Sequence, residues 1–259
     1  MPEIEVHTYG PTDGPEVLAI HGMTGHGQRW ESWSKYLPEA RIIAPDLIGH
    51  GRSRSTPPWS IDAQVEALVD VLDAHASGPV VVVGHSYGGA IAIHLARRSP
   101  ERVRALALFD PAIGLDPDEL LDVAMSTVQH SEYTDADEAR AEKLGGAWRD
   151  VDPALVDAEI EEHLVTTDSG RVRWRLSVPA IVASWGELAR PFVLPPADLP
   201  VTVVQAMQVQ PPYVTAAFEA ALRDSLPHMR YEHFDCDHMV PQAKPAESAE
   251  LVRDLIARG

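Results

Sequence analysis

A serine flanked by glycines stands between two stretches of different character. Val80–Val83 is an unbroken β-branched run, and the motif GHSYGG, residues 84–89, follows it directly. Apolar residues then recur at helical spacing over residues 90–98. A strand, a sharp turn and a helix in this order expose a nucleophilic hydroxyl, because glycines relieve the steric crowding of so tight a turn. The N–H groups at the start of the helix stabilise negative charge there. Ser86 is therefore the candidate nucleophile.

These motifs and their order resemble the α/β-hydrolase superfamily over nearly the whole chain. The segment HGMTG, residues 21–25, follows the strand-like run Val17–Ile20 as the oxyanion loop does in that family. The resemblance implies an oxyanion hole made of the backbone N–H groups of Met23 and Tyr87. It also implies that the general base is His238, which follows the last β-rich run of the chain. Residues 45–53 resemble the loop after the next strand, which we expect to be architectural.

The acid of the triad departs from the usual family pattern. The family places an Asp in the loop after the strand that corresponds to Val201–Ala206, but residues 207–213 contain no carboxylate and carry Gln210 near that position. Some members place the acid after the preceding core strand, where this chain has Asp110. We take Asp110 as the predicted acid. Two alternatives stay open: Asp237 beside the histidine, or a dyad in which Gln210 orients the imidazole without stabilising its positive charge.

Substrate contacts are expected from the oxyanion loop and from aromatic side chains. His21 and Gly22 belong to the loop itself, and Trp30 follows it closely in sequence. Trp148 and Trp185 lie further along the chain, where large apolar rings favour a pocket for an acyl or aromatic group. The competing interpretation is that these tryptophans form the small core of their own segment.

The elements that position these residues alternate between strands and helices. Strand-like runs are Ile4–Tyr9, Val17–His21, Arg41–Pro45, Val80–Val83, Val103–Phe109, Pro200–Ala206 and Met229–Phe234. Helical patterns follow Ser60, Ser86 and Ala246, with Ser60 as an N-cap. Such alternation predicts an α/β fold with a mostly parallel central sheet flanked by helices. The family resemblance makes this an α/β-hydrolase fold.

An inserted block interrupts the alternation from about Leu115 to Pro196. Its pattern predicts four helices, at Asp116–Gln129, Thr134–Gly145, Pro153–Leu164 and Ser177–Leu188. Asp152 before Pro153 is an N-cap followed by proline at the first helical position. We expect residues 115–196 to form a helical cap over the core, which comprises residues 1–114 and 197–259.

Composition narrows the function classes. The chain has 259 residues, 45% of them hydrophobic, and a formal net charge of −18. An acidic surface repels phosphate backbones, so nucleic-acid binding is not expected. Cys236 is the single cysteine, and no run reaches the roughly 20 apolar residues that span a bilayer. Without a visible signal peptide, the prediction is a cytoplasmic protein. No metal-ligand spacing is present, and the chemistry requires no cofactor.

The resemblance implies hydrolysis of a carboxylic ester of small or medium size through an acyl-enzyme intermediate. The same scaffold also accommodates hydrolysis of a carbon–carbon bond, a lactone or a thioester. The missing carboxylate in residues 207–213 raises a further alternative, a catalytically weak protein that binds a ligand in the retained pocket.

Overall fold

Seven strands form one sheet in a computed structural model that describes residues 3–258. They are β1 (Val6–Tyr9), β2 (Glu16–Ile20), β3 (Arg41–Pro45), β4 (Val80–His85), β5 (Val103–Phe109), β8 (Val201–Ala206) and β9 (Arg230–Phe234). Their spatial order is β1-β3-β2-β4-β5-β8-β9. Edge strand β1 runs antiparallel to β3, and the remaining neighbours are parallel. The predicted α/β class and mostly parallel sheet are confirmed.

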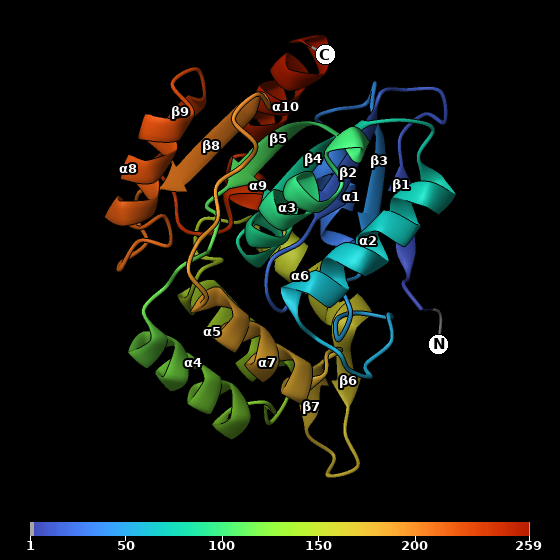
Figure 1. Cartoon of the computed structure of the whole chain (residues 1–259). Coiled ribbons are helices and arrows are strands. Elements are labelled where there is room, and N and C mark those ends of the chain that lie inside the picture. Colours follow the sequence, from blue (N-terminus) through green and yellow to red (C-terminus); the bar gives the residue numbers. More distant parts are fainter. Residues whose placement is uncertain (1–2, 259) are drawn as a thin grey trace.

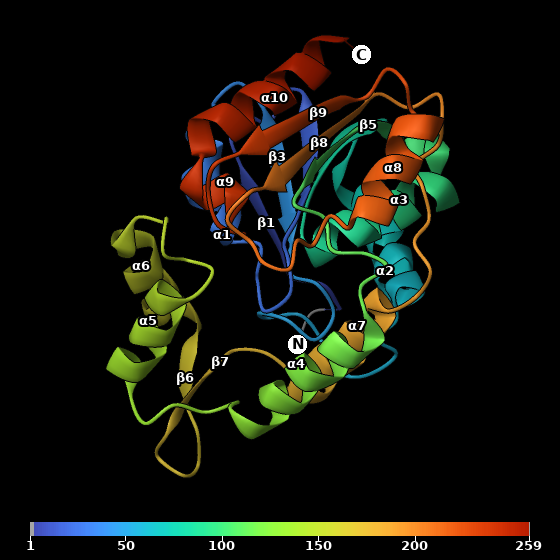
Figure 2. The ribbon, with the colours of Figure 1, turned by 90° about the vertical axis from the view of Figure 1, so that its left-hand side faces the viewer.

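Helices cover both faces of this sheet (Figure 2). On one face lie α2 (Ile61–His75), α3 (Tyr87–Arg98) and α8 (Ala216–Ser225), and on the other α1 (Arg29–Ser34), α9 (Val240–Ala243) and α10 (Pro245–Arg258). Alternate strand residues supply the two apolar layers: Leu18 and Ile20 join the first, Val17 and Ala19 the second. The central strands are buried on both sides, which explains their continuous apolar runs.

The inserted segment lies beyond the carboxyl ends of the parallel strands (Figure 1). It contains α4 (Pro117–Gln129), α5 (Ala136–Gly145), α6 (Pro153–His163), β6 (Leu164–Thr166), β7 (Val172–Trp174) and α7 (Val178–Leu188). Asp152 caps α6 by accepting a hydrogen bond from the N–H of Ala154. The wholly helical pattern expected for this segment is wrong in one respect, because β6 and β7 pair as an antiparallel hairpin. Strands of three residues are too short to leave a periodic signal in the sequence.

The ends of the predicted strands, and of the predicted helices whose bounds were given, lie within two residues of those in the structure. Helices α1, α8 and the four-residue α9 were not expected. The division into core and cap stays a prediction, and its residues 1, 2 and 259 lie outside the described part of the chain. None of the helices within residues 3–258 has the length and apolar composition needed to cross a membrane.

Candidate active site

Ser86 occupies a strained turn between β4 and α3. Its backbone has φ 54° and ψ −121°, a region that L-residues seldom adopt. The turn is fixed by the Ser86 N–H, which donates to the Phe109 carbonyl at 3.0 Å. Gly88 must lack a side chain, because a Cβ there would lie 2.4 Å from the Ile20 carbonyl oxygen. The glycine spacing therefore lets α3 approach β2 closely and holds the serine at the strand end.

The HGMTG loop packs against this serine. A Cβ on Gly22 would lie 3.0 Å from the Cβ of Ser86, so the glycine permits the contact. The N–H groups of Met23 and Tyr87 donate to no backbone carbonyl in residues 3–258. Thr24, the next residue, has φ 60°, in the left-handed region of the backbone. Two N–H groups that no backbone carbonyl occupies, one on the loop and one on the turn that pack together at Ser86, are what an oxyanion hole requires.

His238 and Asp110 are in contact. The distance from His238 Nδ1 to Asp110 Oδ2 is 2.6 Å, and Asp110 is fully buried. The second carboxylate oxygen of Asp110 accepts a hydrogen bond from the Ala206 N–H at 3.1 Å. Its own N–H donates to the Val204 carbonyl at 2.7 Å, with φ 44°. The end of β5 and the end of β8 thus fix this carboxylate on the imidazole nitrogen that faces away from the reaction.

The two alternative partners of the histidine ring lie elsewhere. Asp237 Oδ1 accepts from the backbone N–H of His238 at 2.6 Å, and its other oxygen pairs with Arg149 at 2.7 Å. Gln210 makes no hydrogen bond to His238 among the described residues and instead lines a nearby cavity. Asp110 is the carboxylate that the structure brings to the ring.

Two aromatic residues not expected from the sequence enclose His238. The His85 Nε2–H donates to the His238 carbonyl at 2.8 Å, and the two rings lie 4.7 Å apart. Burial is the main reason that the pKa of His85 lies well below its usual range, and the nearby His238 lowers it further. This donor is therefore a neutral imidazole. The ring of Tyr213 lies 4.2 Å from that of His238. Burial raises the pKa of Cys236 to about 12, which leaves it as an unreactive thiol.

The segment 45–53 braces the oxyanion loop. Asp46 accepts hydrogen bonds from the N–H groups of Gly27 at 2.6 Å and Arg52 at 2.7 Å. His21 donates from Nδ1 to the Gly22 carbonyl at 2.8 Å and accepts from the Leu47 N–H through Nε2 at 2.9 Å. Burial, together with the nearby His50, holds the pKa of His21 well below its usual range. A neutral His21 that makes two hydrogen bonds with its ring therefore supports the loop.

The predicted substrate-contacting tryptophans separate into three environments. Trp30 is 1% exposed and packs edge-on against Trp33 in the core layer beneath the sheet. Trp148 lines a cavity of about 200 Å³ next to Arg29 and Glu159. Trp185 lines a different cavity, of about 360 Å³, together with Tyr213. Of these three rings, Trp185 is the one that shares a cavity wall with a neighbour of His238.

A third cavity, of about 370 Å³, also borders α4. Its wall includes Thr24, which follows Met23 in sequence, and the apolar side chains of Leu176 and Ile181. Val123 of α4 lines this cavity and the one beside Tyr213. Helix α4 therefore borders two cavities: one includes Thr24 of the oxyanion loop, and the other includes Tyr213, whose ring lies beside that of His238. Residues 3–258 contain no cluster of three or more His, Cys, Asp or Glu side chains able to hold a metal ion.

The sequence of this chain is similar to those of known hydrolases. The model of the alpha/beta hydrolase fold family matches residues 15–146. The chain is 50% identical to "Lipase LipV" of Mycobacterium tuberculosis over 255 residues, which cover 98% of each protein.

Two solved structures are also similar. The E-2-(acetamidomethylene)succinate hydrolase has a TM-score of 0.82 at 23% identity, covering 98% of this chain and 95% of the other. A thioesterase domain from the curacin biosynthetic pathway has a TM-score of 0.78 at 21% identity, covering 96% and 94%. These two likenesses concern the fold.

Proposed function

This chain belongs to the alpha/beta hydrolase fold family, and we propose that it hydrolyses carboxylic esters through an acyl-enzyme on Ser86. The observation that carries the proposal is the 2.6 Å contact between His238 and the buried Asp110, at the strand edge where Ser86 lies. The 50% identity to a lipase over nearly the whole chain supports an ester as the substrate. The contact also favours a working enzyme over a ligand-binding relative that lacks an acid.

Each step follows from the position of a group. Ser86 Oγ attacks the ester carbonyl while its proton passes to His238 Nε2, and Asp110 stabilises the imidazolium through Nδ1–H. The carbonyl oxygen becomes an oxyanion that accepts hydrogen bonds from the N–H groups of Met23 and Tyr87. The intermediate collapses as His238 returns the proton to the leaving alkoxide, which departs as the alcohol. Water then attacks the acyl-enzyme, with His238 accepting its proton, and the acid is released.

The two cavities beside α4 fit the two halves of such a substrate. The leaving alcohol must lie near His238, which protonates it, so we assign it the 360 Å³ cavity walled by Tyr213 and Trp185. The acyl chain then extends from the oxyanion loop into the 370 Å³ cavity walled by Leu176 and Ile181. This cavity has room for more than a two-carbon acyl group, and its wall includes the apolar side chains of Val123 and Val178. A medium acyl chain is the expected substrate.

The inserted segment 115–196 supplies most of both walls, which supports its assignment as a cap that sets specificity. The net charge of −18 supports a neutral small molecule as substrate in preference to a polyanion.

The test is hydrolysis of p-nitrophenyl esters from acetate to palmitate by the wild type and by Ser86→Ala. We expect turnover with an optimum at medium chain length, abolished in the variant, and labelling of Ser86 by a fluorophosphonate. A panel of thioesters and lactones run in parallel identifies a different acyl bond. Absence of Ser86-dependent turnover on every acyl substrate, with no labelling, would contradict the proposed function.

A further inference from the structure

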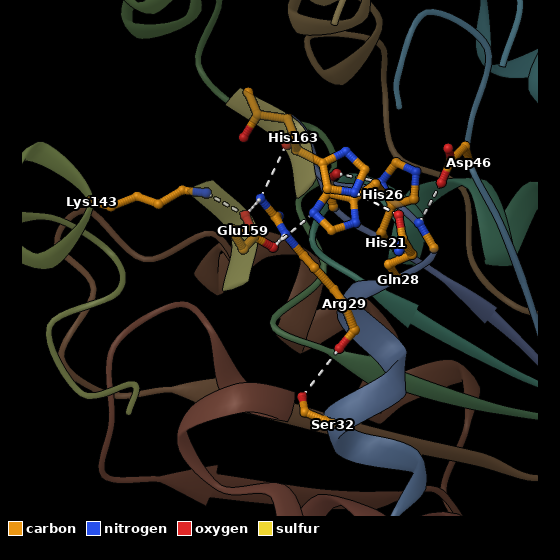
Figure 3. A network of polar contacts seen from close by, with 12 residues as sticks. His21, His26, Gln28, Arg29, Ser32, Asp46, Lys143, Glu159 and His163 are labelled. Atoms are coloured by element: carbon orange, nitrogen blue, oxygen red, sulfur yellow. Dashed lines mark hydrogen bonds and ion pairs between the residues drawn. The ribbon is translucent and has the colours of Figure 1, made fainter. Parts of the chain in front are cut away.

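A buried ion network joins the inserted segment to the first residue of α1 and to the loop that precedes this helix (Figure 3). Glu159 of α6 receives Arg29 Nε on one carboxylate oxygen at 2.5 Å and Arg29 Nη2 on the other at 2.9 Å. Lys143 Nζ and His26 Nε2 also contact this carboxylate, the latter at 2.9 Å. The side chains of Arg29 and Glu159 are 5% and 6% exposed. Such a bidentate pair fixes orientation as well as distance.

The Glu159 carboxylate of this network is held in its charged form. Burial alone would raise the pKa of Glu159, but Arg29 and Lys143 hold it well below its usual range. Removing one member would leave a buried charge without its partner, which destabilises the fold.

Arg29 also reaches the oxyanion loop. The same Nη2 that meets Glu159 donates to the Thr24 carbonyl at 3.1 Å. Thr24 has φ 60°, a conformation that is unfavourable for a β-branched residue and needs support from outside the loop. The Met23 N–H belongs to the Gly22–Met23 peptide, two peptides before the one whose carbonyl Arg29 holds. The Gly25 N–H donates to the Gly22 carbonyl at 3.0 Å, so both peptides belong to one turn, and the direction of the Met23 N–H depends on how that turn is held. Arg29 supplies that support, and Glu159 fixes Arg29.

We propose that Glu159 and Arg29 are positioning residues that connect the inserted segment to the oxyanion hole: docking of α6 aims the Met23 N–H at the reacting oxygen. The inference rests on the proposed function, because it requires the Met23 N–H to bind the oxyanion. It goes beyond that function by making catalysis depend on a residue 130 positions away from Arg29 in the chain. The cavity beside Trp148 is distinct from the two assigned to substrate, so the pair acts without touching the ester.

The test compares Arg29→Lys and Glu159→Gln with the wild type. Lysine retains the charge facing Glu159 but cannot also hold the Thr24 carbonyl in the forked geometry of a guanidinium. A misplacement of about 1 Å at a catalytic group costs up to roughly 100-fold in rate. We expect kcat to fall roughly 10- to 100-fold in both variants, with KM changed less than about threefold. Affinity for butylboronic acid, whose adduct with Ser86 places a charged oxygen in the hole, should fall by a similar factor.

Two control variants separate positioning from stability. Asp157→Asn breaks the exposed pair of α6 with Arg140 and should leave kcat unchanged. Lys143→Met removes another partner of Glu159 that does not contact Thr24, and should lower thermal stability while kcat stays within about threefold. In the Arg29 and Glu159 variants, the pH midpoint of kcat/KM should stay at its wild-type value, because the contact between His238 and Asp110 is intact.

Three results would overturn the inference: wild-type kcat in folded Arg29→Lys, an equal loss of kcat in Lys143→Met, or a shifted pH midpoint. The first two would leave a purely structural ion network, and the third would place the damage at His238. The proposed function is judged separately, by Ser86-dependent turnover in the wild type. Its failure would be evident before any of these variants is compared.

Discussion

Replacing Asp110 by Asn tests the least usual feature of the site. The Asp110 carboxylate accepts two hydrogen bonds, from His238 Nδ1–H and from the Ala206 N–H. Asn offers one acceptor and one donor group in the same space. If the amide oxygen faces His238, its NH₂ meets the Ala206 N–H, donor against donor. If the oxygen faces Ala206, the NH₂ meets the imidazole and favours the ring without a proton on Nδ1.

The second orientation removes catalysis. A histidine that carries its proton on Nε2 cannot accept the Ser86 proton, and a neutral amide does not stabilise the imidazolium. We therefore expect kcat to fall about 10⁴-fold, which corresponds to about 5.5 kcal/mol of transition-state stabilisation. The first orientation leaves buried donors unsatisfied and lowers the free energy of unfolding by about 1–3 kcal/mol. Either orientation is measurable, and a folded variant with low kcat is the main expectation.

The assay is kcat and KM on p-nitrophenyl butyrate, with urea unfolding as the measure of fold. Asp237→Asn and Gln210→Ala are the matched controls, and each should retain kcat within a few-fold because neither side chain contacts the imidazole. Near-normal kcat in Asp110→Asn, or a large loss in either control, would refute the assignment of the acid.

Further predictions concern stability, packing and specificity. Burial lowers the pKa of His50 to about 4 and that of His163 to about 3, so between pH 6.5 and 4 the unfolded chain binds protons that the folded chain does not. Stability should be complete above pH 6.5 and fall by about 1.4 kcal/mol per pH unit for each group as the pH drops; urea unfolding at pH 7.5, 6 and 5 would show no such trend if these histidines titrate normally. Gly88→Ala should cost about 1–3 kcal/mol of stability and most of the activity, since its Cβ would lie 2.4 Å from a β2 carbonyl; wild-type melting and kcat would exclude this packing. Ile181→Trp should reduce kcat/KM on long acyl esters far more than on acetate, whereas Leu120→Trp should discriminate among alkyl acetates; the reverse pattern would exchange the two pocket assignments.

The sheet and the nucleophile turn were predictable because their signals are local. An apolar run bounded by glycine or proline marks each buried strand, and the motif at residues 84–89 carries its own flanking strand and helix. The six-residue helix α1 and the hairpin of β6 and β7 were not predictable, since elements so short leave less than one or two periods in the sequence. They form because tertiary packing holds them.

Contacts between distant segments were the least accessible to sequence. Asp110 was predicted as the acid through the family resemblance, since the residues alone do not show that β5 and β8 are neighbours, with Phe109 in register with Val204. The pairing of Arg29 with Glu159 has no local signal, because nothing in α6 distinguishes this glutamate from the two that follow it. Trp30 illustrates the opposite error, in which closeness in sequence suggests closeness to the site, while the helix α1 turns that ring into the core.

The location of Asp110 has a consequence for how this protein can diverge. The proposed nucleophile and acid both stand at the ends of adjacent strands, β4 and β5, before the inserted segment begins. The loop after β8 therefore needs no acid for proton transfer, and its residues 209–213 line a pocket instead. Mutations there can reshape the cavity beside Tyr213 while the chemistry is conserved. In laboratory evolution, this loop and α4 are the segments to randomise for a new leaving group, with Ser86, Asp110 and His238 held constant.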